Sequence, residues 1–398
     1  MLKHPTTPHK APVLSSFTIG SFRGLRNVTL DRLSLLNLLV GGNNSGKTSV
    51  LEAMAILSAG DDIREWLSVA RMRDVRDRLV VRDSLPGLSL LDALVWLFPH
   101  DNSDEGQFSD PRKIELSLLR DQHQARLLAE CEPVTQVRHL RIGSRNVSAA
   151  PSDLEEVRGW RISGFHSGLS DLYSKQNELL FDGLEKDIAF EFNFWEDGLD
   201  FGFQPRSSKL FPSIMMPPYA HRNQSAILRG YSRALKKDYK SDVLRLIRKL
   251  DGNITDIEII TQGDGRIPVM TLRHRRSGLT PLSVFGDGIR RALTIALSMP
   301  RVRNGLLLID EIDAAMHVSA LDEFFHWLAE ACETMNVQLV ATTHSLEAVN
   351  AMIGAVAPNG LKALSSYHLE GGEDGVRVKR FYGEMLNRVV REGGLDIR

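Results

Sequence analysis

A glycine-rich segment that ends in lysine and threonine is the first place where this sequence could do chemistry. Residues 41–48 read GGNNSGKT, which matches the pattern G-x-x-x-x-G-K-[ST]. Backbone amides of such a loop bind phosphate oxygens, Lys47 would reach the outer phosphates, and the Thr48 hydroxyl would ligate Mg²⁺. The expected nucleotide-binding residues are Gly41, Asn43, Asn44, Ser45, Gly46, Lys47, Thr48 and Ser49.

Two acidic residues follow an apolar run in the segment GLLLIDEID. An acidic pair after a strand is usually a solvated turn, but a P-loop elsewhere in the chain favours a functional interpretation. At the carboxyl end of a buried strand, Asp310 would hold Mg²⁺, and Glu311 would accept a proton from the attacking water.

A third strand-like segment, VQLVATTHS, ends in Thr343, His344 and Ser345. An imidazole at this edge of the sheet could bind the γ-phosphate or the attacking water, although a histidine at a strand end is often only a polar surface group. We therefore place Glu311, His344 and Lys47 in the expected catalytic set.

The elements that must position these residues can be outlined from hydrophobic periodicity. Apolar residues 35–40 indicate a buried strand before the P-loop, and an amphipathic helix should follow it. Residues 61–111 indicate charged helices, 113–130 and 187–204 antiparallel strand pairs, and 225–252 one or two helices. In the last third, expected strands at 254–261, 267–274, 305–310 and 337–344 alternate with helices, which is typical of a parallel sheet in an α/β fold.

One further segment, LSVFGDGIRRALTIALSM, places Gly286 and Gly288 at the start of an apolar helix. Glycine weakens a helix and suits places where the backbone closely approaches another group. The residues alone leave that group open.

Taken together, FRGL, LLVGGNNSGKTSVLEA, GDGIRRAL, IDEID and TTHS resemble the heads of ABC-type ATPases. The similarity is to the soluble branch that includes RecF, Rad50 and the overcoming-lysogenization-defect (OLD) family, described as AAA15 or AAA21 ATPases. It covers residues 13–59 and 254–398. It implies ATP and Mg²⁺ as cofactors and an α/β head with a mixed or parallel central sheet, an antiparallel β subdomain and a helical insertion. The expected division is an N-terminal lobe 1–60, the subdomain and insertion 61–250, and a C-terminal lobe 251–398.

The resemblance also implies an oligomer. In such heads, a signature segment contacts the γ-phosphate of ATP bound to the opposite subunit, and here Ser283, Gly286 and Gly288 occupy that position. A dimer or higher homo-oligomer with composite sites is therefore expected. The sequence departs from transporter heads by lacking consecutive signature glycines, and Ser319–Asp322 lies too far from Asp310 to be assigned as their D-loop.

Composition excludes several classes of protein. The chain has 398 residues and a net charge of −1, so a nucleic-acid or membrane surface would have to be a local patch. Cys131 and Cys332 lack metal-site spacing, and no apolar run reaches the length of a membrane span, so we expect a soluble, cytoplasmic protein. Basic clusters near residues 71–82, 233–249 and 273–276 leave direct DNA binding open.

Three functions remain. The first is an ATP-switched homo-oligomer that controls a separately encoded effector, such as a Toprim nuclease, in phage defence; it resembles the ATPase subunit of PARIS systems. The second is a RecF-like repair ATPase that clamps DNA itself. The third is a nucleotide-dependent scaffold with negligible turnover. Residues 345–398 are too few for a Toprim domain after His344, so we expect no nuclease activity from this chain alone.

Overall fold

The computed structural model describes eleven stretches of the chain, and these form two compact units. The described residues are 13–73, 87–100, 112–120, 123–139, 154–167, 188–195, 198–200, 209–262, 267–357, 360–372 and 375–394. The first unit comprises Met1–Ser16, Leu30–Leu51 and Phe211–Arg398, and the second comprises Phe17–Thr29 and Glu52–Leu210. The expected lobes at 1–60, 61–250 and 251–398 stay a prediction.

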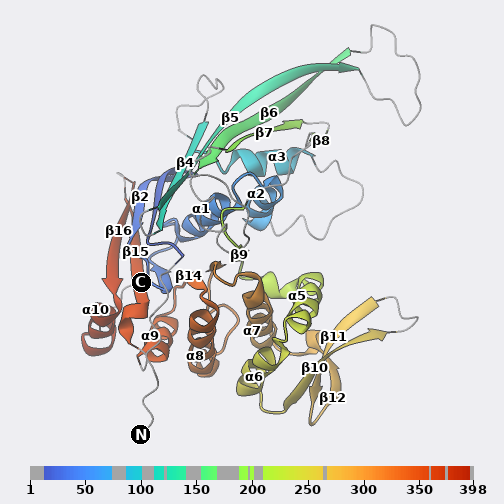
Figure 1. Cartoon of the computed structure of the whole chain (residues 1–398), viewed down its shortest axis with the longest axis vertical. Coiled ribbons are helices and arrows are strands. Elements are labelled where there is room, and N and C mark those ends of the chain that lie inside the picture. Colours follow the sequence, from blue (N-terminus) through green and yellow to red (C-terminus); the bar gives the residue numbers. More distant parts are fainter. Residues whose placement is uncertain are drawn as a thin grey trace, which may run out of the picture. The chain divides into compact units, whose positions relative to one another are not determined.

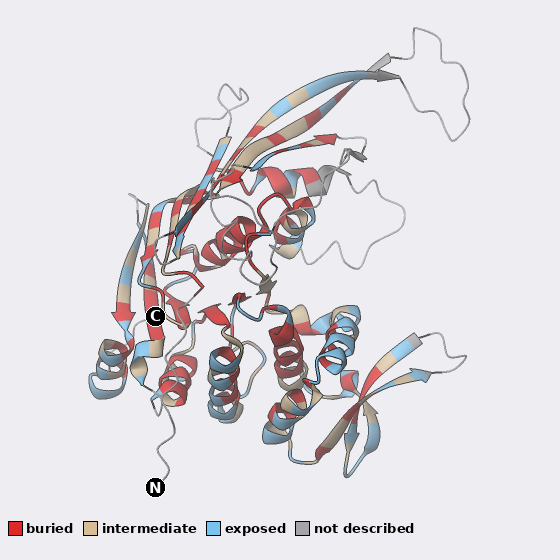
Figure 2. Ribbon diagram, in the orientation of Figure 1, coloured by how far each residue is buried: buried red, intermediate tan, exposed pale blue. Residues whose placement is uncertain are grey.

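A six-stranded mixed sheet forms the centre of the first unit, which confirms the α/β class (Figure 1). Its order is β16 (Gly375–Tyr382), β15 (Leu364–Gly372), β3 (Leu36–Val40), β14 (Gln338–Thr342), β13 (Leu306–Ile309) and β9 (Ser213–Met216). Strands β15, β3, β14, β13 and β9 run parallel, and β16 is antiparallel to β15. Every residue of β3, β13 and β14 is buried (Figure 2), as expected for parallel strands covered on both faces.

Helices of the first unit contribute buried apolar residues to the same core as this sheet. They are α5 (Gln224–Lys236), α6 (Lys240–Leu250), α7 (Asp287–Ser298), α8 (Val318–Met335), α9 (Leu346–Val356) and α10 (Gly383–Asn387). Short helical turns are η3 (Ala220–Arg222), η4 (Leu282–Val284), η5 (Met299–Arg301), η6 (Leu361–Ala363) and η7 (Arg388–Glu392). Helices α8 and α9 lie side by side (Figure 1), and Leu293, Phe325 and Met352 join sheet residues in one buried core.

One expectation about strand pairing was wrong. Strands β10 (Ile254–Gln262) and β11 (Ile267–His274) do not join the parallel sheet; with β12 (Gly278–Pro281) they form a separate antiparallel sheet of three strands. The physical reason is visible in the residues. Ile257 and Leu272 are buried while Asp256 and Glu258 are partly exposed, and such alternation suits a sheet with only one covered face.

The second unit contains the antiparallel β subdomain. Its sheet follows the order β2 (Leu25–Asp31), β1 (Ser16–Phe22), β4 (Arg112–Arg120), β5 (His123–His139), β6 (Leu154–Ser167), β7 (Ile188–Trp195) and β8 (Gly198–Asp200). Strands β4 to β8 pair antiparallel, which confirms the strand pairs expected near 113–130 and 187–204. Helices α2 (Ile63–Ala70) and α3 (Gly87–Val95) and the turn η1 (Arg71–Arg73) accompany them, and Trp66 contacts Phe98 and Phe190 with ring centroids 6.4 and 6.0 Å apart.

Both cysteines are buried free thiols, in different units. Burial raises the pKa of Cys131 to about 12 and also raises the pKa of Cys332, so both side chains are neutral near pH 7. Within the described part of the chain, none of the helices has the length and apolar character needed to cross a bilayer.

Candidate nucleotide site

The glycine-rich loop joins β3 directly to helix α1 (Lys47–Ala59), as the sequence predicts. Gly41 has φ +135°, and a Cβ atom there would lie 2.2 Å from the backbone oxygen of Leu369 on the neighbouring strand β15. Asn44 and Gly46 also have positive φ, at 60° and 91°. These conformations curl the backbone around the start of α1, and the close approach to β15 restricts position 41 to glycine.

Lys47 lies over this loop. Its Nζ donates hydrogen bonds to the carbonyl oxygens of Gly41 and Gly42, at 2.9 and 2.6 Å, and to Ser45 Oγ at 3.3 Å. Burial lowers the pKa of Lys47, although the negative charges of Asp310 and Glu311 act in the opposite direction. The amine is therefore held where phosphate oxygens would replace the loop carbonyls as its partners.

The predicted magnesium ligands come together although 262 positions separate them. Thr48 Oγ1 donates to both carboxylate oxygens of Asp310, at 3.1 and 3.2 Å, and Thr342 Oγ1 donates to Asp310 Oδ1 at 2.7 Å. A hydroxyl and a carboxylate are hard oxygen ligands that fit Mg²⁺. In the described stretches, no cluster of three or more His, Cys, Asp or Glu residues could hold a metal.

Glu311 begins the loop after β13 with an unusual backbone. Its φ is +47°, a left-handed value that non-glycine residues seldom adopt, and its side chain is exposed. Its amide nitrogen donates to Thr342 Oγ1 at 2.8 Å, and Arg291 Nη2 donates to its carbonyl oxygen at 2.6 Å. The carboxylate is thus anchored through its main chain at the carboxyl edge of the parallel sheet.

Residues after β14 reach the same edge, because Thr342 pairs with Leu39 of β3. His344 is exposed on the short loop between β14 and α9, and Ser345 caps α9 by accepting a bond from the Ala348 amide at 3.1 Å. Thr343 Oγ1 donates to Asp313 Oδ1 at 2.5 Å and so ties this loop to the one that follows β13. The role of His344 in binding the γ-phosphate or the attacking water stays a prediction.

The expected signature residues Ser283, Gly286 and Gly288 lie on η4 and at the start of α7 in the first unit. Ser283 and Gly286 are exposed, and Gly286 lies immediately before α7. Gly288 lies against the loop after β13, where a Cβ atom would be 3.0 Å from the Ala315 oxygen. Their expected contact with a nucleotide bound to a second subunit stays a prediction.

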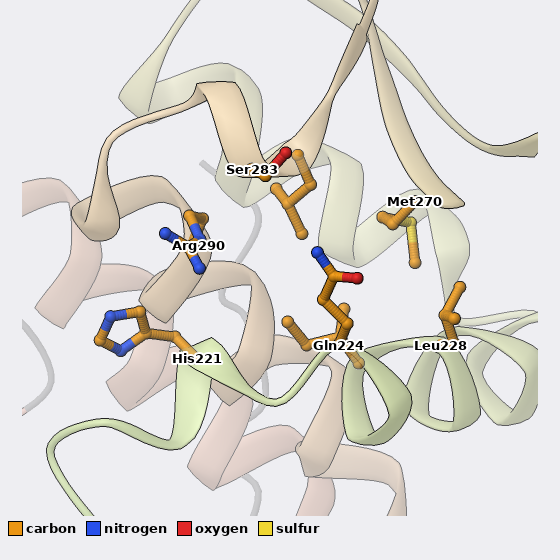
Figure 3. Close-up of a pocket in the computed structure, with 8 residues that line it drawn as sticks. His221, Gln224, Leu228, Met270, Ser283 and Arg290 are labelled. Atoms are coloured by element: carbon orange, nitrogen blue, oxygen red, sulfur yellow. The ribbon is translucent and has the colours of Figure 1, made fainter. Parts of the chain in front are cut away.

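A small hollow adjoins the signature segment, with a volume of about 10 Å³, room for one water. Figure 3 shows Gln224 pointing into it between Ser283 and Met270, with His221 and Arg290 at one side. It is too small for a nucleotide.

Sequence reasoning missed Thr342, Arg291 and His221. Thr342 bonds both acidic residues after β13, Arg291 is buried and bonds the main chain beside them, and buried His221 lies 3.4 Å from Asp287 of α7. The sequence contained the motifs TTHS and GIRR, but nothing local showed which side chain would be buried.

Several residues of the basic clusters form ion pairs with acids where the structure describes them. In the second and third clusters, Lys240 pairs with Asp256 at 2.7 Å, Lys249 with Glu323 at 3.1 Å, and Arg273 with Glu258 at 2.7 Å. In the first cluster, Arg73 pairs with fully buried Glu52 at 2.7 Å, while Arg76, Arg78 and Arg82 lie outside the described residues. Ser319–Asp322 forms the first turn of α8.

Two protein families match the segments of the chain that carry these residues. The family described as AAA ATPase domain (AAA_15) matches residues 13–115, which include the P-loop. The AAA_21 family, an AAA domain family whose description also names AbiEii toxin and type IV toxin–antitoxin systems, matches residues 159–350, which include Asp310, Glu311 and His344. The chain belongs to the AAA ATPases.

Relatives of this AAA ATPase differ in how much of it they cover. An ATP/GTP phosphatase of Helicobacter pylori is 21% identical over 94% of this chain and 97% of its own length. An uncharacterized protein of Methanocaldococcus jannaschii is 32% identical over 29% of this chain and 99% of its own length. RecF of Shewanella frigidimarina is 41% identical over 68 residues, which are 17% of this chain and 19% of RecF.

Among solved structures, this AAA ATPase is similar to SMC head domains. The SMC head bound to the C-terminal winged-helix domain of ScpA has a TM-score of 0.45 and 12% sequence identity, covering 94% of this chain and 99% of the other. The SMC head of Thermotoga maritima has a TM-score of 0.40 and 12% identity, covering 92% of this chain and 98% of the other.

Proposed function

We propose that this protein binds ATP with Mg²⁺ and hydrolyses it to ADP and phosphate. The observation that carries the proposal is the convergence of Thr48, Asp310 and Thr342, with Glu311 held beside them. Loop amides and Lys47 would bind the phosphates, and Mg²⁺ at Thr48 and Asp310 would offset their charge. The H. pylori relative, named an ATP/GTP phosphatase, supports the same reaction class.

Glu311 has the role of general base in this proposal. A water molecule attacks the γ-phosphorus and gives its proton to the Glu311 carboxylate, while the bond to the β-phosphate oxygen breaks and ADP leaves. His344 would orient the water or the γ-phosphate from the same edge of the sheet. Ser283, Gly286 and Gly288 would complete the site of a neighbouring subunit in a dimer or higher homo-oligomer.

The test separates binding from hydrolysis. Glu311→Gln should bind ATP·Mg²⁺ with wild-type affinity in calorimetry yet release phosphate at least roughly 10²-fold more slowly, because a general base typically contributes that much. Lys47→Ala should lose nucleotide binding, since it removes the cation that meets the outer phosphates. Wild-type turnover by Glu311→Gln would refute the assignment, and negligible turnover by the wild-type protein would favour the scaffold function.

We further propose that the ATP state controls a separately encoded effector, such as a Toprim nuclease, in bacterial phage defence. A partner that prefers one arrangement of the heads shifts the equilibrium by its difference in affinity, and typical coupling of about 1–3 kcal/mol changes affinity roughly 5- to 150-fold. The purified chain should cut neither DNA nor RNA, and its neighbouring gene product should co-purify in a nucleotide-dependent way. Nuclease activity of the isolated chain would contradict this role.

A RecF-like ATPase that clamps duplex DNA is the second candidate. The 68-residue segment that is 41% identical to RecF favours this function. The ion pairs of Lys240, Lys249 and Arg273 with acidic side chains count against it, because they leave fewer cations to bind DNA phosphates. Salt-sensitive, ATP-dependent duplex binding without any partner would select this function.

A further inference from the structure

The side chain of Arg291 is buried but bonds the main chain. It lies on α7 and is 2% exposed. Its Nη2 donates to the carbonyl oxygens of Asp310 and Glu311, at 2.9 and 2.6 Å, and its Nη1 donates to the carbonyl oxygen of Pro218, after β9. One guanidinium therefore joins α7 to the ends of two parallel strands.

The two carbonyls that Nη2 binds belong to the peptide groups on either side of the Glu311 Cα atom. Fixing both peptide planes fixes φ and ψ of that residue, which has the left-handed φ of +47°. The Thr342 hydroxyl adds a third constraint by accepting the Glu311 amide at 2.8 Å. Strained backbone of this kind persists only where the surroundings hold it, and it concentrates at functional sites.

A buried cation is a costly way to fill space, since an apolar side chain would pack there without desolvating a charge. Burial lowers the pKa of Arg291, although Asp313, Glu311 and Asp310 attract its charge. What the guanidinium offers that an apolar side chain lacks is several rigidly arranged donors. That property suits the fixing of a backbone conformation.

Helix α7 also begins at the signature segment. Gly286 precedes its first residue, and Gly288 lies against the Ala315 oxygen in the loop after Glu311. The helix thus contacts the segment after β13 at two points, through Gly288 and through Arg291. A displacement at the start of α7 would reach the main chain of Glu311 directly.

We propose that Arg291 is a positioning residue that holds the Glu311 main chain in its left-handed conformation and so orients the carboxylate toward the attacking water. Through the same contacts, the orientation of Glu311 depends on the position of helix α7. The role rests on the proposed ATPase function. Because Arg291 acts on the base and not on the nucleotide, its loss should slow hydrolysis without weakening ATP binding.

The test is a double-mutant cycle with Arg291→Lys, Glu311→Gln and both together. Arg291→Lys retains the charge but loses the planar set of guanidinium donors. We therefore expect kcat to fall about 10- to 100-fold, which is the loss typical of a slightly misplaced group. KM and ATP affinity should stay within about threefold of wild type. The double variant should be no slower than Glu311→Gln alone, because a positioning residue has nothing left to position. Arg245→Lys, on the exposed surface of α6, is the matched control and should keep wild-type turnover.

Other outcomes overturn the inference. An unchanged kcat in Arg291→Lys, effects that multiply in the double variant, or a parallel loss of ATP affinity would each show that Arg291 does not act through Glu311. If Arg291→Lys fails to fold, Arg291→Gln, which keeps two N–H donors without the charge, enters the same cycle. If hydrolysis by the wild-type protein does not depend on Glu311, both the proposed function and this role of Arg291 are wrong. If the wild-type protein is active and substitution of Arg291 leaves kcat unchanged, only the role of Arg291 is wrong.

Discussion

At the residue scale, two adjacent glycines in the P-loop have different physical requirements. Gly41 combines φ +135° with an approach to the Leu369 backbone that leaves no room for a Cβ atom. Gly42 is exposed, and nothing lies within 4 Å of the place where its Cβ atom would be. The motif requires glycine only at the first of these positions, and the structure gives the physical reason, because only Gly41 is indispensable to the local fold.

Gly41→Ala should therefore destabilise the protein by about 3 kcal/mol or fail to give soluble material, since it adds backbone strain to a clash with a main-chain oxygen. Gly42→Ala should change the free energy of unfolding by less than about 1 kcal/mol. Urea denaturation followed by circular dichroism compares the two variants. Equal stability of both would contradict the geometry at Leu369.

At the element scale, contacts between charged side chains stabilise the start of α7. Asp287 accepts a bond from Arg290 Nη1 at 2.7 Å, and His221 Nε2 and Arg222 Nη2 lie 3.4 and 3.6 Å from its other oxygen. Burial lowers the pKa of His221 below 6.5; Asp287 opposes that shift, whereas Arg291 and Arg290 reinforce it. The histidine on η3 is thus neutral at pH 7 and packs against the signature helix.

This arrangement predicts a pH dependence of stability. Between pH 6.5 and the lower pKa of folded His221, the unfolded chain binds more protons, so the free energy of unfolding falls as the pH is lowered through that window. One such proton contributes a slope of at most about 1.4 kcal/mol per pH unit. His221→Gln lacks this contribution, so its stability relative to wild type should improve on going from pH 7 to pH 5. Parallel stability curves over that range would count against the assignment.

At the scale of the whole molecule, composite sites predict complementation between inactive subunits. Lys47→Ala retains its signature segment. Gly286→Glu, at an exposed position with nothing within 4 Å of an added Cβ atom, retains its P-loop and its own Glu311 loop, so a mixed dimer rebuilds one intact site. After subunit exchange in an equimolar mixture, half of the dimers are mixed and about a quarter of wild-type phosphate release should return.

The control is ATP binding by Gly286→Glu alone, which should stay close to wild type because its own P-loop is unchanged. A turnover rate per subunit that does not depend on concentration, measured for a verified monomer, would contradict the composite site and leave each chain to hydrolyse ATP by itself.

The sequence alone determined what depends on local order. A continuous apolar strand, a glycine-rich turn and a helix are adjacent in the chain, so the P-loop and the roles expected of Lys47 and Thr48 could be inferred from residues 35–59. Four apolar residues before Asp310 likewise predicted a buried strand that ends at the site, and the structure has β13 there. These signals are strong because strand, turn and helix geometry repeat within a few residues.

Only the tertiary structure decided which elements pair and which side chains become buried. β10 and β11 form their own antiparallel sheet, and the short strand β9 takes the place beside β13. Arg291 looks like any other surface arginine in GIRR, and its burial follows from packing α7 against the ends of β13 and β9. Thr342 and Asp310 meet because β14 and β13 are parallel neighbours with aligned ends. Such contacts join residues far apart in the chain, and their energies depend on the packing of the whole unit, which no local pattern records.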